Sequence, residues 1–302
     1  MAKSDIYITD FKNYVEKEKG YSAHTIKSYL HDLGRFHSFM TSYLNKSEWS
    51  VENVDKQTIR HFLGREFESG FASKTVARRL ATIKSFFKYL LSNNIIDVNP
   101  AAEVRTPKTP KSLPAFISEK MIGELMNIPD MSTINGCRDK AILELFYSTG
   151  MRLSELVGLN FGDFQFDQHL VRVFGKGQKE RLIPFGNYAK ISMEHYWQKR
   201  GINIRTAESS KPCFVNVNNK RLSIRTVQRR VKKYIQQVAE GKSIGPHTLR
   251  HSFATHMLER GADIRALKDL LGHSSLSSTQ IYTHIQPEKM KEIYNQAHPH
   301  SE

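Results

Sequence analysis

The segment Asn99-Pro-Ala-Ala-Glu-Val-Arg-Thr-Pro-Lys-Thr-Pro-Lys-Ser-Leu-Pro-Ala-Phe-Ile-Ser118 decides how the chain is organised. Its prolines remove backbone donors and fix the backbone, which blocks a regular helix and favours an extended conformation. We therefore expect residues 100–117 to link a domain of residues 1–99 to a domain of residues 118–302.

Upstream of this linker, apolar residues recur at three- and four-residue steps between polar breaks, which is the pattern of amphipathic helices. Ser22 and Ser73 stand where helix N-caps are expected, because a serine hydroxyl accepts a hydrogen bond from a free N–H of the first turn. We expect a small all-helical domain with helices at about 5–18, 23–44, 55–69 and 73–93.

Downstream of the linker, the apolar period changes from helical to strand-like and back. Gly150 is expected to cap a helix, and another helix should begin near Arg152. Short strands are expected at 164–166, 170–174 and 181–184, the last two joined by the hairpin tip Gly175-Lys176-Gly177-Gln178-Lys179. Helices are expected at about 118–127, 135–148, 188–198, 223–238, 248–259, 263–271, 276–283 and 287–296. The fold class is mainly α with a small antiparallel β-sheet.

The composition indicates a basic protein with an acidic partner. The 302 residues include 45 Lys and Arg against 30 Asp and Glu, a net charge of +15 at pH 7. No apolar run approaches the roughly 18 residues of a membrane span, and residues 1–14 carry charge where a secretory signal is apolar. We expect a cytoplasmic protein whose partner is nucleic acid, not a membrane. Cys137 and Cys213 lack metal-ligand spacing and are expected to be packing residues.

The helix at 73–93 carries two different faces. At about 100° per residue, its apolar residues fill one arc and its cations fall on the opposite one. A basic helical face is more often solvated than functional, but both halves of this chain share the positive charge. The residues expected to contact DNA here are Lys74, Arg78, Lys84 and Lys88.

Several common site signatures fail on the residues present. Gly175-Lys176-Gly177 lacks the earlier glycine and the following Ser or Thr of a P-loop ATPase. His247 and His251 stand four apart as in a zinc hydrolase, but Thr248 stands where that motif has Glu, so a zinc enzyme is a weak alternative. The sequence contains no Gly-x-Ser-x-Gly elbow and no carboxylate cluster of a two-metal nuclease, and we expect no metal site.

Six residues form a set suited to phosphoryl transfer without a metal: Arg152, Lys176, His247, Arg250, His273 and Tyr282. Arginine grips non-bridging phosphate oxygens in a bidentate fork, and two arginines can stabilise the extra charge of a pentavalent transition state. A lysine on a turn can protonate a leaving oxygen, and a tyrosine can attack phosphorus. Taken singly, each residue also fits a structural role, such as an ion pair between Arg152 and Glu155 at a helix start.

The order and spacing of these residues resemble the tyrosine site-specific recombinase, or phage integrase, family. The resemblance rests on Arg152, a Gly-Lys-Gly hairpin at Lys176, His-x-x-Arg at 247–250, Leu-Gly-His at 271–273 and Tyr282 nine residues on. It covers nearly the whole chain. Pro-His-Thr-Leu-Arg-His-Ser-Phe-Ala-Thr-His at 246–256 and Ile-Tyr-Thr-His at 281–284 resemble the Xer subgroup most closely.

The resemblance implies a mechanism. Tyr282 would attack the scissile phosphate to give a 3′-phosphotyrosyl link, while the two arginines hold the non-bridging oxygens. The two histidines would assist, and Lys176 would protonate the departing 5′-oxygen, with no cofactor. Two rounds of exchange would pass through a Holliday junction. Glu155 would orient Arg152 or the surroundings of His273.

The resemblance also implies the architecture and partners. A helical core-binding domain and a mixed α/β catalytic domain would form a C-shaped clamp on a double-stranded DNA recombination site. Four protomers, of this recombinase alone or with a second one, would resolve chromosome or plasmid dimers at the nucleoid, with a DNA translocase as activator. The exchange helix 287–296 would dock Met290, Ile293 and Tyr294 on a neighbouring protomer; packing on its own domain is the alternative.

Two other functional classes stay open at this point. One is a related enzyme, either a type IB topoisomerase or a mobile-element integrase, although an extra N-terminal arm-binding domain that would favour an integrase is not visible. The other is a DNA-binding protein with no chemistry.

Overall fold

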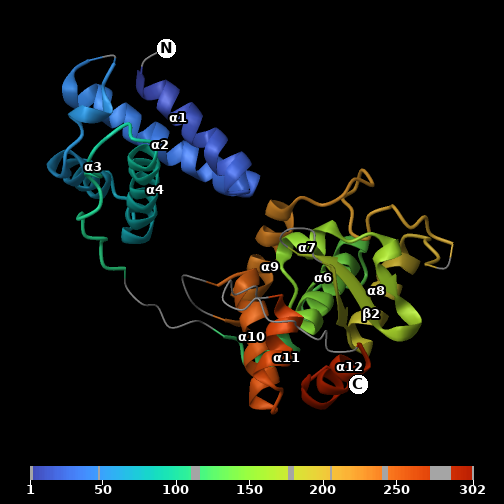
Figure 1. The fold of residues 1–302 in the computed structure, drawn as a ribbon. Helices are drawn as coiled ribbons and strands as arrows, with labels where there is room; N and C mark the ends of the chain where they lie inside the picture. Colours follow the sequence, from blue (N-terminus) through green and yellow to red (C-terminus); the bar gives the residue numbers. More distant parts are fainter. Residues whose placement is uncertain are drawn as a thin grey trace. The chain divides into compact units, whose positions relative to one another are not determined.

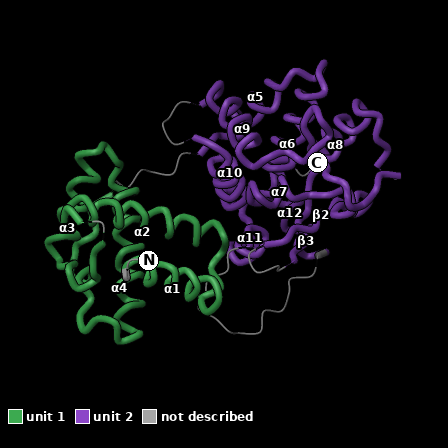
Figure 2. Tube along the Cα trace, turned by 90° about the horizontal axis from the view of Figure 1, so that it is seen from above, with its two compact units in different colours: residues 1–112 green, residues 113–302 purple. Residues whose placement is uncertain are grey.

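The computed structural model describes residues 3–46, 48–109, 116–175, 180–204, 206–239, 244–272 and 287–300. The chain divides into two compact units, residues 1–112 and residues 113–302 (Figure 2). The boundary falls inside residues 100–117, where the sequence places the linker. Ala101 and Val104 are buried in the core of the N-terminal unit, so the first part of that stretch packs on this unit.

The described part of the N-terminal unit is helical, as predicted (Figure 1). Its elements are α1 (Lys3–Asn13), a π-helical turn (Tyr14–Glu18), α2 (Ala23–Leu44), a 3-10 turn (Val51–Asn53), α3 (Lys56–Glu68) and α4 (Ser73–Ser92). The prediction that Ser22 caps α2 is confirmed, because its Oγ accepts from the Thr25 N–H at 3.2 Å. The predicted cap at Ser73 is wrong by one residue: Ala72 is the N-cap, and its carbonyl accepts from the Val76 N–H.

Helix α4 has the two faces that its sequence predicts. The predicted apolar arc is fully buried in the core of the unit: Val76, Leu80, Ile83, Phe86, Phe87 and Leu90. Arg79 is also buried, which the helical pattern does not indicate. Its guanidinium pairs with Glu66 and lies over the Phe71 ring, 4.0 Å from the centroid. A buried charge is tolerated when it is paired in this way.

The C-terminal unit is a helical array with a small sheet packed at one side (Figure 1). Its elements are α5 (Glu119–Met126), α6 (Ile134–Thr149), α7 (Leu153–Gly158), β1 (Phe164–Gln165), β2 (Leu170–Phe174), β3 (Glu180–Pro184), α8 (Asn187–Lys199), α9 (Ile224–Val238), α10 (Pro246–Glu259), α11 (Ile264–Leu271) and α12 (Pro287–Ala297), with 3-10 turns at Phe161–Asp163 and Phe166–Gln168. The helix predicted at 276–283 lies outside the described residues.

The three strands form an antiparallel sheet in the order β1-β2-β3. In its central register Val171 faces Ile183, and the hairpin closes with Phe174 opposite Glu180. The expected class, mainly α with a small antiparallel sheet, is confirmed. The hairpin tip itself, residues 176–179, lies outside the described residues.

Helix α6 is the centre of the C-terminal unit. Almost all of its residues are buried, since α5, α7, α8, α9, α10 and β3 all pack against it. A helix that is covered on all sides has no solvent face and therefore no amphipathic stripe. Cys137 on α6 and Cys213 are both free and fully buried, which confirms that they are packing residues.

Helix α12 packs on its own unit. Met290, Tyr294 and Ala297 are buried in the same core as α6, and the Tyr294 hydroxyl lies 2.6 Å from Ser148 Oγ. The single chain therefore shows the alternative arrangement for this stripe, not a contact with a neighbour. Among the described helices, none is long and apolar enough to cross a membrane.

Candidate active site

Three of the six predicted catalytic residues lie in the described part of the C-terminal unit. Arg152 is the N-cap residue of α7, and His247 and Arg250 stand on α10. His247 is exposed in the first turn of its helix, and Arg250 is half-buried. Lys176, His273 and Tyr282 lie outside the described residues.

The turn that leads to Arg152 depends on Gly150. This residue caps α6 in the left-handed region, with φ of +55°, as predicted. A Cβ at this position would lie 2.3 Å from the Phe253 ring of α10. Glycine is therefore required both by the backbone conformation and by the close approach of α10. The turn brings the Gly150 carbonyl to Arg250, whose Nη1 donates to it.

Arg152 is held by Glu155 and by the end of α11. Its backbone N–H donates to Glu155 Oε2 at 2.7 Å, and its Nη1 donates to Oε1 at 2.9 Å. Its Nη2 donates to the Gly272 carbonyl at 2.6 Å. The simple ion pair expected of these two residues is present, but it is one part of a larger arrangement. The carboxylate caps α7 and orients the guanidinium at the same time.

Arg181, on β3, completes this arrangement and was not predicted as a site residue. Its Nη1 and Nη2 donate to the two oxygens of Glu155 at 3.0 and 2.8 Å. Its Nε donates to the Leu270 carbonyl at 3.0 Å. Its sequence signal is weak: it lies two residues after the hairpin tip that carries Lys176. We call Arg152, Arg181, Arg250 and Glu155 the arginine cluster.

Three successive carbonyls at the end of α11 hold the three arginines apart. The carbonyls accept in succession: Leu270 from Arg181, Leu271 from Arg250 at 2.7 Å, and Gly272 from Arg152. Cations are favoured there because helix C-terminal carbonyls carry partial negative charge. Arg152, at the start of α7, and Arg250, on α10, therefore share an anchor at the end of α11.

The cluster carries more positive than negative charge, with three guanidinium groups against one carboxylate. Burial by itself raises the pKa of Glu155, but hydrogen bonds from Arg181 and from the Arg152 backbone outweigh it and hold that pKa below its usual value. Burial, and then the charge of Arg152, lower the pKa of Arg250 to about 10. Arg250 stays charged at neutral pH, and an anion placed in the cluster would relieve this repulsion.

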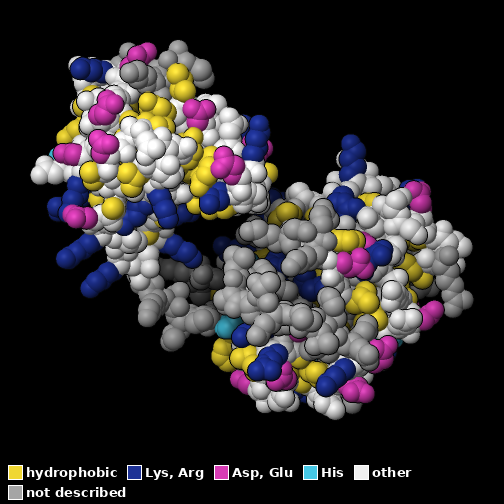
Figure 3. All heavy atoms as spheres, viewed as in Figure 1, with side chains coloured by type: hydrophobic (Ala, Val, Ile, Leu, Met, Phe, Trp, Pro, Cys, Tyr) yellow, Lys and Arg dark blue, Asp and Glu magenta, His cyan; other side chains and the backbone are white. Residues whose placement is uncertain are grey.

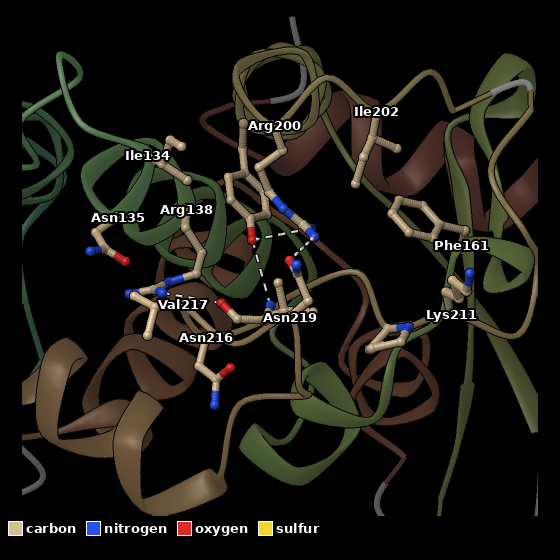
Figure 4. Close-up of a pocket in the computed structure, with 13 residues that line it drawn as sticks. Ile134, Asn135, Arg138, Phe161, Arg200, Ile202, Lys211, Asn216, Val217 and Asn219 are labelled. Carbon is tan, nitrogen blue, oxygen red and sulfur yellow. Dashed lines mark hydrogen bonds between the residues drawn. The ribbon is translucent and has the colours of Figure 1, made fainter.

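A separate hollow of about 730 Å³ opens elsewhere on the C-terminal unit (Figure 4). Arg200 on its wall donates to Asn219 at 3.2 Å, and Arg138 donates to the Val215 carbonyl at 3.1 Å. None of the arginine-cluster residues lines it. We therefore do not assign the catalytic chemistry to this hollow.

The four cations predicted to contact DNA differ in their surroundings. Lys74 and Lys88 are exposed on α4, while Lys84 is half-buried and its Nζ lies 3.3 Å from the Ala102 carbonyl. Arg78 pairs with buried Asp32 and donates to Ser28 Oγ at 2.7 Å, so part of its charge is used inside the unit. In Figure 3, Lys and Arg side chains project from the lower side of the N-terminal unit.

Comparison with known proteins gives matches along the chain. Residues 115–289 match the phage integrase family, and residues 8–94 match the phage integrase N-terminal SAM-like domain. Tyrosine recombinase XerC of Thermodesulfovibrio yellowstonii is 41% identical over 302 residues, covering 99% of this chain and 98% of that protein. Tyrosine recombinase XerC of Syntrophus aciditrophicus is also 41% identical, covering 98% of each.

Solved structures show the same fold. A lambda integrase dimer bound to a COC′ core site aligns with a TM-score of 0.70 and 18% identity, over 94% of this chain and 100% of that one. XerH recombinase bound to palindromic difH substrate aligns with a TM-score of 0.68 and 20% identity, over 95% and 84%. The chain belongs to the phage integrase family, the tyrosine site-specific recombinases, and to its Xer subgroup. It is a DNA strand-exchange enzyme.

Proposed function

We propose that Arg152 and Arg250 of the arginine cluster hold the scissile phosphate of DNA while Tyr282 attacks it. The observation that carries this proposal is the shared anchor of Arg152 and Arg250 on successive carbonyls of α11. Two forked donors held by the same turn keep a constant separation, which suits them to the non-bridging oxygens of one phosphate. Because they are fixed before the substrate arrives, little reorganisation is needed when charge grows in the transition state.

One cleavage step exchanges a phosphodiester bond for a phosphotyrosyl bond. The Tyr282 oxygen forms a bond to phosphorus, and the bond from phosphorus to the 5′-oxygen breaks. Lys176 supplies the proton that the 5′-oxygen takes up. His247 and His273 assist by hydrogen bonding or proton transfer, and one of them accepts the phenolic proton that Tyr282 gives up. The tyrosyl ester keeps the energy of the phosphodiester, so the 5′-hydroxyl of a partner duplex reverses the step. Two rounds pass through a Holliday junction.

A nicked duplex that traps the covalent intermediate tests this assignment. Wild-type protein should accumulate a protein–DNA adduct, and Tyr282→Phe should bind the same duplex with equal affinity and form none. Tyr188→Phe is the matched control, since this tyrosine is exposed on α8 and should react as wild type does. Adduct formation by Tyr282→Phe would mean that another residue is the nucleophile.

The biological role is proposed from the relatives. XerC proteins match this chain over its whole length, whereas the lambda integrase match rests on the fold alone. We infer resolution of chromosome or plasmid dimers at a double-stranded site, supporting chromosome partition at cell division. The enzyme would work in the cytoplasm at the nucleoid, as a tetramer of one or two recombinases activated by a DNA translocase.

Gene deletion tests that role. Loss of the gene should raise the fraction of plasmid dimers, and wild-type protein but not Tyr282→Phe should restore monomers. A dimer fraction that does not change would favour a mobile-element integrase instead.

The proposal for DNA binding is a clamp in which both units contact the duplex. The cations of α4 support it, since each neutralised phosphate releases condensed counterions. Residues 1–112 form a compact unit with its own core, so this piece can be measured alone. It should bind DNA more weakly than the full chain and with salt-dependent affinity. Absence of any salt-dependent binding would contradict the clamp.

In the assembled tetramer, we propose that α12 docks on a neighbouring protomer. The single chain shows the same stripe filling its own core, with Tyr294 against Ser148. Tyr294→Ala should therefore leave DNA binding by one protomer intact and reduce synapsis of two duplexes. If synapsis is unchanged, α12 serves only its own unit.

A further inference from the structure

Glu155 is a buried carboxylate shared by two arginines. Its side chain is 3% exposed, and each of its oxygens accepts one hydrogen bond from Arg152 and one from Arg181. Arg152 is 39% exposed and Arg181 only 15%. The two arginines therefore differ in exposure: the Arg152 side chain faces outward, and the Arg181 side chain is enclosed behind the carboxylate.

We propose that Arg181 is a positioning residue that keeps Arg152 in place and available for the phosphate, an inference that rests on the proposed role of Arg152. Arg181 acts through Glu155, and it contacts no reacting atom in this proposal. Nothing in the motif that led to the family includes it.

The charges explain why a second arginine is needed. Glu155 alone beside Arg152 would neutralise the guanidinium that has to bind an anion. With Arg181 donating to both oxygens, the carboxylate is compensated from behind, and the positive charge of Arg152 remains for the phosphate. Removing Arg181 would leave a buried carboxylate that draws Arg152 toward itself.

The geometry explains why the residue is an arginine. Three of its N–H groups, in one plane, reach two carboxylate oxygens and the Leu270 carbonyl at 2.8 to 3.0 Å. A lysine ammonium is a point donor on a flexible stem and cannot reproduce this planar fork. The Arg181 guanidinium also lies close against the end of α11, because a Cβ at Gly272 would lie 3.0 Å from its carbon atom.

Arg181 also ties the sheet to α11. It extends from β3 and holds the carbonyl next to the two that anchor Arg250 and Arg152. Loss of this contact would loosen the turn that sets the separation of the two arginines. We therefore expect this loss to lower the rate of cleavage more than the affinity for DNA.

Cleavage of the nicked duplex at saturating protein is the readout, measured beside DNA affinity and the unfolding midpoint. Arg181→Ala should cleave about 10- to 100-fold more slowly, as supporting partners of a site typically do, while affinity changes little. Guanidinium ion at millimolar concentration should restore part of the rate, and Arg181→Lys should stay slow although it keeps charge and bulk. Arg172→Ala, on neighbouring β2 with its own carboxylate partner Asp163, is the matched control and should cleave normally.

A double-variant test separates this role from general stability. If Arg181 acts through Glu155, Arg181→Ala in a Glu155→Gln background should add almost nothing to the loss caused by Glu155→Gln. Full additivity, or cleavage by both Arg181→Ala and Arg181→Lys at the rate of Arg172→Ala, would overturn the inference. Arg152→Ala must be inactive in the same assay: activity there would refute the proposed site itself, and with it the role of Arg181.

Discussion

Replacing Gly150 with alanine tests the turn on which the site is built. A non-glycine residue in the left-handed conformation costs roughly 1–2 kcal/mol. The added Cβ would lie 2.3 Å from the Phe253 ring, and such overpacking costs roughly 1–3 kcal/mol. The free energy of unfolding of the C-terminal unit should fall by their sum, about 2–5 kcal/mol. At about 2–4 °C per kcal/mol for a unit of this size, its midpoint should fall by about 4–20 °C.

Tryptophan fluorescence can follow this unit by itself. The chain has two tryptophans, Trp49 in the N-terminal core and Trp197 in the C-terminal core. In a Trp49→Phe background, the signal of Trp197 reports the C-terminal unit alone. Gly123→Ala is the matched control: a Cβ in this turn of α5 meets nothing within 4 Å, and the substitution should stabilise the unit by about 0.5–1 kcal/mol.

Gly150→Ala should also slow the cleavage of DNA. Since the Gly150 carbonyl accepts from Arg250, a displaced turn moves this guanidinium, and cleavage should slow at a temperature where the variant is still folded. An unchanged Trp197 midpoint in Gly150→Ala would refute the argument from close approach. A lowered midpoint with normal cleavage would show that the Gly150 carbonyl does not position Arg250.

Three further predictions concern charge and protonation. Arg250→Lys cannot span the Gly150 and Leu271 carbonyls with one fork, so cleavage should fall about 100- to 1000-fold with little change in DNA affinity; equal losses in both would make Arg250 a simple DNA contact. Lys176→Ala should recover cleavage on a 5′-bridging phosphorothiolate, whose thiolate leaves without a proton, and lack of rescue would exclude it as the general acid. Burial lowers the pKa of His298 to about 3, below its unfolded value near 6.5, so the unfolded state binds the extra proton. The C-terminal unit should therefore lose stability as pH falls from about 6.5 toward 3, and His298→Gln should lose less, as measured by urea unfolding at pH 7 and pH 5.

Local features of the fold could be predicted from the sequence. The helices of the N-terminal unit follow from apolar residues at three- and four-residue steps, and the buried arc of α4 follows from its period. The cap at Ser22 and the left-handed Gly150 depend on residues a few positions away. Ser73 shows the usual error at a boundary, since Ala72 already has the extended backbone of an N-cap.

The sequence by itself also indicated a candidate set of residues for the chemistry, because the order and spacing of a tyrosine, a lysine, two histidines and two arginines resemble those of a tyrosine recombinase. Only the tertiary structure decided what holds Arg152 and Arg250. Arg250 donates to carbonyls from the ends of α6 and α11, and Arg152 donates to Gly272, 120 positions along the chain. The roles of Arg181 and of buried Arg79 were likewise invisible in their own helix or strand. The partners of these arginines come from distant segments of the chain. Local periodicity predicts helices and strands, but it does not indicate which distant backbone oxygen or carboxylate will lie beside a guanidinium in the folded protein.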